Sequence, residues 1–100
     1  MSFDYRQSIP SDHPALAGHF PGNPVVPGVV LLDLVREGLS AWQPDQRISG
    51  IRQVKFMRAL LPEQALDMQL EIQSGRLLFR GHHGEDLILQ GEATLGVHLG

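Results

Sequence analysis

The sequence reads VVLLDLVREGLSAW from Val29 to Trp42. Within this segment the polar side chains recur every three or four residues, so in a helix they occupy an arc of only roughly 100°. They are Asp33, Arg36, Glu37 and Ser40. Because almost every other side chain is apolar, we predict a helix from Val29 to about Trp42 that other structure surrounds on about three sides.

The segments on either side of this helix have the properties of strands. Met68, Leu70 and Ile72 alternate with polar residues, which is the period-two pattern of a half-buried strand. We expect strands at residues 3–9, 48–60, 65–73, 76–81 and 86–97. Ser74-Gly75 and His82-His83-Gly84 predict turns, so the last three strands should form an antiparallel meander. One long helix with about five antiparallel strands is typical of the α+β class.

Length and composition are those of a small globular domain, which we predict to span residues 1–100. Hydrophobic residues make up 42% and charged residues 19%, and the lack of cysteine excludes disulfides and cysteine-based zinc sites. The N-terminus does not resemble a signal peptide, and the longest apolar run, residues 29–32, is too short to cross a bilayer. We therefore expect a cytoplasmic protein without a membrane span. The net charge of −3 argues against a nucleic-acid partner.

Basic residues gather in one segment despite the negative net charge. Between Gln46 and Pro62 there are four basic residues and no acidic one. These residues, which we call the basic segment, are Arg47, Arg52, Lys55 and Arg58. One interpretation is a solvated strand face. The other is a docking surface for an acidic partner, because the local field rather than the net charge steers encounter.

Residues 11–27, just before the helix, combine prolines with glycines, so we predict a loop with a constrained backbone. His19 lies in this loop, between Gly18 and the sequence Phe20-Pro21-Gly22. A histidine on a fixed backbone suits general-base chemistry near neutral pH. A purely structural histidine is the alternative.

Two residues at the start of the helix suit the same chemistry. Gly28 follows Pro27, and the free N–H groups of a first helical turn stabilise a negatively charged ligand oxygen. Simple helix-entry chemistry is the alternative interpretation of this Pro-Gly pair. Asp33 has apolar neighbours along the chain, which tend to keep a carboxyl protonated and able to donate its proton. On the polar arc of the helix, however, Asp33 would be solvated or paired with Arg36.

The remaining histidines do not predict a metal site. They are His13 in the loop, His82 and His83 in a predicted exposed turn, and His98 in the C-terminal tail. No pair of them has the spacing of a catalytic zinc site.

The residues from His19 to Asp33 resemble the signature of the 3-hydroxyacyl-(acyl carrier protein) dehydratases, which have the hotdog fold. The matching pattern is His-Phe-Pro-Gly-x-Pro-Val-Val-Pro-Gly-Val-x-x-x-Asp. Weaker similarity covers residues 54–62, and Gly91-Glu92-Ala93 also fits. The resemblance implies a long central helix wrapped by a curved antiparallel sheet. It also implies dimers, here a homodimer or a larger assembly of dimers, in which two sheets join edge to edge.

The resemblance further implies a mechanism at a site shared by two subunits. His19 would remove the α-proton of a 3-hydroxyacyl thioester, the Gly28 N–H would hold the thioester carbonyl, and Asp33 of the other subunit would help the β-hydroxyl leave as water. The residues expected to contact the substrate are Phe20, Pro21, Val26 and Glu37. The acyl chain would be carried on the phosphopantetheine arm of an acidic acyl carrier protein that docks on the basic segment. No metal and no other cofactor is implied.

Three differences from the family bear on the substrate. The acid is aspartate, as in the branch that also isomerises the enoyl product, whereas glutamate is common in the general dehydratases. Glu37 stands where glutamine is common, and the chain is shorter than typical members. Short members of this kind are found in pathways for specialised lipids or polyenes as well as fatty acids. Two alternatives stay open, a hotdog thioesterase and a non-catalytic module that binds acyl chains or carrier protein.

Overall fold

The computed structural model describes residues 1–16 and 25–97 of the chain. In order, its elements are β1 (Ser2–Gln7), the short 3₁₀ helix η1 (Pro14–Leu16), α1 (Gly28–Trp42), β2 (Gln46–Phe56), β3 (Leu66–Gln73), β4 (Arg76–His83) and β5 (Asp86–Val97). The strands form one five-stranded antiparallel sheet in the order β1-β3-β4-β5-β2. The predicted α+β architecture and the antiparallel meander of β3, β4 and β5 are therefore confirmed.

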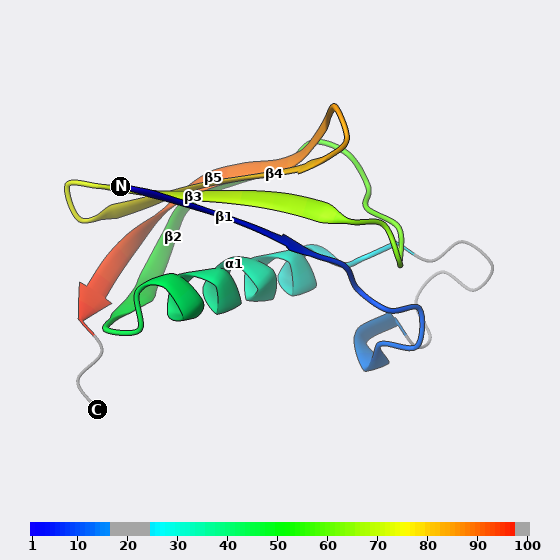
Figure 1. The fold of residues 1–100 in the computed structure, drawn as a ribbon, viewed down its shortest axis with the longest axis horizontal. Helices are drawn as coiled ribbons and strands as arrows, with labels where there is room; N and C mark the ends of the chain where they lie inside the picture. The colour runs from blue at the N-terminus through cyan, green and yellow to red at the C-terminus, as the bar shows by residue number, and fades with distance from the viewer. Residues whose placement is uncertain (17–24, 98–100) are drawn as a thin grey trace.

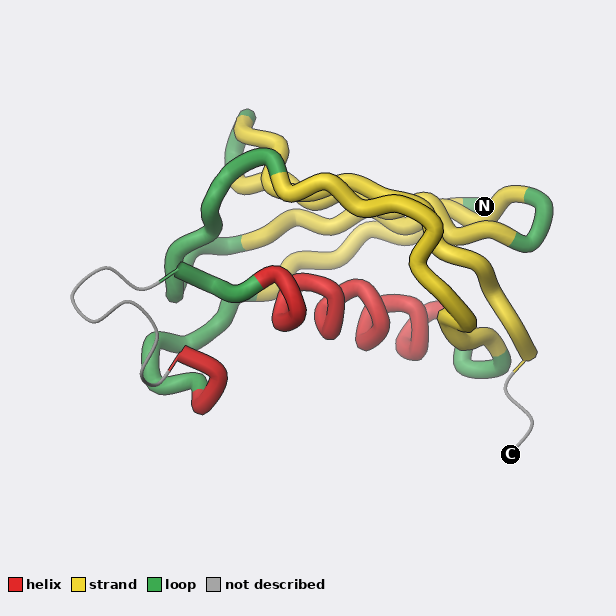
Figure 2. The backbone as a smooth tube through the Cα atoms, turned by 180° about the vertical axis from the view of Figure 1, so that it is seen from behind, coloured by secondary structure: helices red, strands yellow, loops and turns green. Residues whose placement is uncertain are grey.

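The hydrophobic core lies between α1 and the sheet. Figure 1 shows the helix running along one face of the sheet, and Figure 2 shows the same two layers from behind. Val35 and Leu39 of α1 are at most 1% exposed, as are Leu70 of β3 and Leu77 of β4. Alternation along β3 sends its apolar side chains into this core and its polar ones outward, as its sequence predicts. No helix in the described part of the chain is long and apolar enough to cross a membrane.

The face of α1 that points away from the sheet is open. The polar arc predicted from the sequence is exposed throughout, and the apolar Val29 is 69% exposed. The prediction that structure surrounds α1 on about three sides is therefore wrong for a single protomer. A single sheet covers only one face of a helix, so the apolar excess at the start of α1 has no partner within the described protomer.

Several element boundaries differ from those predicted, including β1, which the sequence predicts at 3–9 and which spans Ser2–Gln7, and the end of β2 depends on a contact distant in sequence. The strand expected at 48–60 runs from Gln46 to Phe56, because the N–H groups of Met57 and Arg58 both turn to the Ile88 carbonyl, at 2.7 and 3.4 Å. The strand expected at 76–81 continues to His83 and turns at residues 84–85.

Candidate active site at the N-terminus of helix α1

The first turn of α1 presents amide groups that no described residue accepts. Pro27 precedes the helix with φ −62° and ψ 149°, and its carbonyl accepts hydrogen bonds from the N–H groups of Val30, at 3.0 Å, and Leu31, at 3.3 Å. Among the residues that the structure describes, no acceptor lies within bonding distance of the N–H groups of Gly28 and Val29. These two donors, together with the positive end of the helix dipole, make this helix end suited to a ligand oxygen.

An aromatic ring, which the sequence alone does not reveal, lies against this helix end. A Cβ atom added to Gly28 would come within 2.8 Å of Cζ of Phe56, at the end of β2. The Phe56 ring is 48% exposed, and Met57, Leu61 and Val29 are also exposed. Gly28 therefore also makes a close contact with Phe56, beyond the two roles that the sequence suggests for it.

Asp33 lies on the open face of α1. Its carboxylate pairs with the guanidinium of Arg36 one turn further along, and both side chains are more than half exposed. This is the solvated, paired arrangement that the sequence offers as the alternative for Asp33. Among the described residues, Asp33 lacks the apolar surroundings expected from its neighbours, because Leu34 and Val35 point into the core on the opposite face.

Glu37 is also exposed on this face, one turn beyond Asp33. Its charge acts on Tyr5 of β1, whose hydroxyl donates a hydrogen bond to the Leu34 carbonyl. Burial raises the pKa of Tyr5 well above its ordinary value, the charge of Glu37 raises it further, and a hydrogen bond with the Gly38 backbone opposes both. The charge of Glu37 thus acts on Tyr5, which holds β1 to the helix.

Among the other residues expected to touch substrate, the described Val26 does not face Gly28. The side chain of Val26 is buried in the core, with 6% exposure, and its N–H donates to the Leu60 carbonyl at 2.8 Å. Val26 therefore offers no surface to a ligand in the protomer. His19, Phe20 and Pro21 lie outside the described residues.

The basic segment is exposed but partly neutralised by β5. Arg52 forms an ion pair with Glu92 at 2.9 Å, and Arg58 approaches Asp86 at 3.8 Å. Glu92 also pairs with Arg76 of β4, at 3.3 Å. The segment itself lacks acidic residues, but the sheet places acids from β5 beside it. The local positive field is therefore weaker than the sequence suggests.

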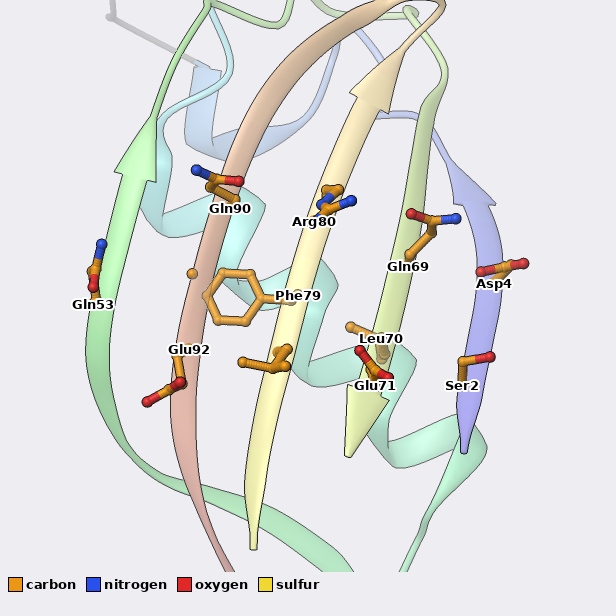
Figure 3. A pocket seen from close by; sticks show the side chains of 12 residues that line it. Ser2, Asp4, Gln53, Gln69, Leu70, Glu71, Phe79, Arg80, Gln90 and Glu92 are labelled. Carbon is orange, nitrogen blue, oxygen red and sulfur yellow. The ribbon is translucent and has the colours of Figure 1, made fainter. Parts of the chain in front are cut away.

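Two hollows lie away from the helix end. One, of about 480 Å³, is on the outer face of the sheet, and Figure 3 shows Asp4, Gln69, Arg80 and Gln90 in a row across it. The other, of about 540 Å³, is lined by residues of β1, β3 and β4, together with residue 84. Neither hollow, as formed by the described residues, is lined by Gly28 or Asp33.

The histidines of β4 are not the exposed turn residues that the sequence predicts. Both His82 and His83 are half-buried, and Nδ1–H of His83 donates to the Ala65 carbonyl at 2.7 Å. No group of three potential metal ligands forms within residues 1–16 and 25–97. His83 therefore helps to join the ends of β3 and β4.

Comparison with known proteins identifies the relatives of this chain. A family described as ApeI-like, the ApeI dehydratases, matches residues 1–94. The 3-hydroxyacyl-(acyl carrier protein) dehydratase FabZ of Syntrophotalea carbinolica is 29% identical over 101 residues, which cover 89% of this chain and 69% of FabZ. FabZ of Desulforamulus reducens is 27% identical over 104 residues, which cover 91% and 73%.

Solved structures agree with this assignment. The dehydratase heterocomplex ApeI:P from Xenorhabdus doucetiae superposes with a TM-score of 0.84 at 26% identity, over 94% of this chain and 86% of that one. A probable thioesterase from Bartonella henselae superposes with a TM-score of 0.74 at 16% identity, over 97% and 90%, and so shares the fold alone. The predicted hotdog fold is confirmed, and the protein is a hotdog-fold dehydratase, a lyase. More specifically, the chain belongs to the ApeI-like dehydratase family.

Proposed function

We propose that this protein dehydrates a 3-hydroxyacyl thioester, carried by an acyl carrier protein, to a trans-2-enoyl thioester. His19 removes the proton on the carbon next to the thioester carbonyl. The Gly28 N–H stabilises the enolate-like oxygen, and Asp33 gives a proton to the departing β-hydroxyl, which leaves as water. The phosphopantetheine arm of the carrier holds the substrate, and the reaction uses no further cofactor.

The observation that carries this proposal is the open N-terminus of α1. Negative charge develops on the carbonyl oxygen as the α-proton leaves, and preorganised N–H donors are the groups that stabilise such a charge. Gly28 and Val29 supply two such donors at the positive end of the helix dipole. FabZ relatives that match most of the chain are named for this reaction.

A second subunit would complete the site. Asp33 is exposed on α1, and its carboxylate contacts only the Arg36 guanidinium among the described residues. β2 is an edge strand, with Ile51 at 43% exposure and Phe56 at 48%. Pairing of β2 with an equivalent strand of the second subunit would cover this edge. It would also bring apolar surface to the N-terminal end of α1 in each subunit. The related ApeI:P structure is a heterocomplex, so the partner is either a second copy or a related chain, and a homodimer is our proposal.

The basic segment suits the acidic carrier. Arg47 and Lys55 form no ion pair among the described residues, and Arg58 has only a long one. These three side chains therefore keep most of their field for a partner, while Arg52 is largely committed to Glu92. We also propose that the carrier delivers the substrate in the cytoplasm and that the product enters fatty-acid, specialised lipid or polyene synthesis.

Hydration of a short trans-2-enoyl thioester tests the reaction class, because loss of enoyl absorbance reports the reverse reaction directly. Wild type should react, and His19→Ala and Asp33→Asn should each lower the rate by about 10²-fold or more, since each removes an acid or base. Unfolding midpoints of the variants, matched to wild type, provide the control. Unchanged rates in both variants would contradict the assigned roles.

The same assay separates the alternatives. A thioesterase would release free thiol from the substrate, whereas a dehydratase leaves the thioester intact. A non-catalytic module would bind an acylated carrier, and neither wild type nor the His19→Ala and Asp33→Asn variants would consume the enoyl group. Sedimentation of a folded monomer at micromolar concentration would argue against the shared site.

A further inference from the structure

The outer face of the sheet, which points away from α1, carries a row of polar side chains that crosses all five strands. Residues that pair directly across neighbouring strands present their side chains on the same face. From the β1 edge to the β2 edge, the paired residues of this row are Asp4, Gln69, Arg80, Gln90 and Lys55. Figure 3 shows the first four of them across the hollow of about 480 Å³. The row therefore has an acid at one edge, a base at the other and a second base in its middle.

The two bases of this row lack an acidic partner. Arg80 and Lys55 are both exposed, and neither forms an ion pair among the described residues. The paired neighbours of Arg80 are the neutral side chains of Gln69 and Gln90. Gln90 is also the paired neighbour of Lys55. We call Arg80 and Lys55 the two unpaired cations.

The acids in the neighbouring rows of the sheet are neutralised by other arginines. Glu92 of β5 pairs with Arg52 at 2.9 Å and with Arg76 at 3.3 Å. Asp67 of β3 pairs with Arg6 at 2.6 Å. Because two arginines share Glu92, that group adds positive charge to β4, β5 and β2 instead of cancelling the field of the two unpaired cations.

The opposite half of the outer face carries the opposite charge. Asp4 of β1 and Glu71 of β3 form no ion pair among the described residues. Both strands lie on the far side of β4 from β2. An acidic partner is therefore repelled from the half formed by β1 and β3 and attracted to the half formed by β4, β5 and β2.

Distances decide which basic residues act together. The two unpaired cations lie two strands apart, which separates their Cα atoms by roughly 10 Å. Arg47 lies eight residues before Lys55 in β2, which is roughly 26 Å along the strand. Charges interact strongly only within about 8 Å at physiological ionic strength, so Arg47 adds little to this surface within a protomer. Lys55, by contrast, directly precedes Phe56, which lies against Gly28 at the N-terminus of α1.

We propose that Arg80 and Lys55 form the surface on which the acidic acyl carrier protein docks. A carrier held there lies beside the end of β2 that meets the N-terminus of α1. Edge-to-edge pairing of β2 with a second subunit leaves the outer face of the sheet uncovered, so this surface stays accessible in the proposed dimer. The inference rests on the proposed function, in which the substrate is carrier-linked. It keeps Lys55 from the basic segment and adds Arg80, which only the pairing of strands brings into the same row.

Two forms of one substrate test this surface by enoyl hydration. The trans-2-butenoyl group is supplied either on acyl carrier protein or on pantetheine alone, and the measured quantity is the ratio of the two kcat/KM values. Arg80→Gln and Lys55→Gln should each lower the ratio of carrier-linked to pantetheine-linked substrate roughly threefold, and the double variant roughly tenfold. The expected change lies in KM for the carrier-linked form, because the lost charges act on docking and not on the chemical step.

Gln73→Glu is the matched control for these variants. It makes the same change in net charge as either single variant, on an exposed side chain at the end of β3 away from Gly28. Its ratio should equal that of wild type, and the unfolding midpoints of all variants should match. Added salt should raise the KM of wild type for the carrier-linked substrate more steeply than that of the double variant.

The outcomes separate this inference from the proposed function. A wild-type ratio in the double variant, with normal enoyl hydration, would overturn the docking surface and leave the reaction intact. An equal loss of rate with both substrates would also overturn it, because the two cations would then act on the site and not on the carrier. If wild type hydrated neither substrate, the proposed function would fail. Titration of acyl carrier protein against wild type and the double variant would then decide the docking surface alone, and equal affinities would overturn it.

Discussion

The two ends of helix α1 use the same steric device for different purposes. At each end a glycine stands where an aromatic ring lies too close for a side chain, Phe56 at Gly28 and Tyr5 at Gly38. At Gly38, an added Cβ atom would overlap the Tyr5 ring and hydroxyl outright. At Gly28 it would meet only the far tip of the Phe56 ring.

The surroundings of the two rings differ more than the contacts themselves. Tyr5 is tied to the Leu34 carbonyl and stacks on Phe3, which stacks in turn on Trp42 with the ring centroids 5.7 Å apart. Phe56 is half-exposed at the end of an edge strand. The C-terminal half of α1 is thus anchored within the protomer, whereas the described residues leave the side chains at its N-terminal end largely exposed.

The largest expected effect is that of Gly38→Ala. Alanine raises helix propensity by about 1 kcal/mol, but overpacking against a ring held by its own hydrogen bond costs about 1–3 kcal/mol. The added Cβ would overlap the Tyr5 ring outright, so the cost should lie in the upper half of this range, about 2–3 kcal/mol. We therefore expect a net loss of about 1–2 kcal/mol in the free energy of unfolding, measured in urea at fixed protein concentration. Ser40→Ala, exposed on the same helix, is the control and should change stability by less than about 0.5 kcal/mol. A Gly38→Ala variant as stable as wild type would mean that the Tyr5 anchor is loose.

Removal of the Tyr5 hydroxyl should have the next largest effect. Tyr5→Phe keeps the ring and its stacking but leaves the Leu34 carbonyl without this donor, which should cost about 1 kcal/mol of unfolding free energy. The same urea experiment measures it. Unchanged stability would assign the anchor to ring packing alone.

The raised pKa of Tyr5 gives this anchor a pH dependence. The folded protein holds the phenol proton more tightly than the unfolded chain, whose tyrosine ionises near pH 10. The contribution of Tyr5 to stability is therefore complete below about pH 10 and is lost as the pH rises above it. Since Tyr5 is the only tyrosine, tyrosinate absorbance against pH, in native and urea-unfolded protein, measures the shift directly. A native midpoint equal to the unfolded one would contradict the buried anchor.

The smallest effect on stability should come from Gly28→Ala. The half-exposed Phe56 ring is free to rotate away from the new methyl group, so the loss should stay below about 1 kcal/mol. Enoyl hydration should still fall by about tenfold or more, because the methyl group and the displaced ring crowd the N–H groups at the helix end. A stability loss as large as that of Gly38→Ala would make the two ends equivalent and remove the contrast between them.

Much of the fold is readable from local sequence. The start and end of α1, its exposed polar arc and the alternation in β3 follow from side-chain periodicity, which depends only on neighbours along the chain. The pairing of Asp33 with Arg36 is foreseeable for the same reason, since residues three apart on a helix are neighbours. The end of β2 is not foreseeable, because the Ile88 carbonyl of another strand decides it.

The candidate site likewise combines features that local sequence determines with contacts that only distant segments make. Residue types and spacing identify Gly28, Asp33 and the basic segment without any structure, because each follows from local helix chemistry or local charge. Only the tertiary structure brings Phe56 against Gly28, Glu92 beside Arg52, and the Glu63 carboxylate onto Ser11. These pairs are separated by 28 or more positions in the sequence, and their contacts depend on how the sheet curves over the helix. The sequence therefore determined which groups are available for the chemistry, and the packing of distant strands decided which of them meet.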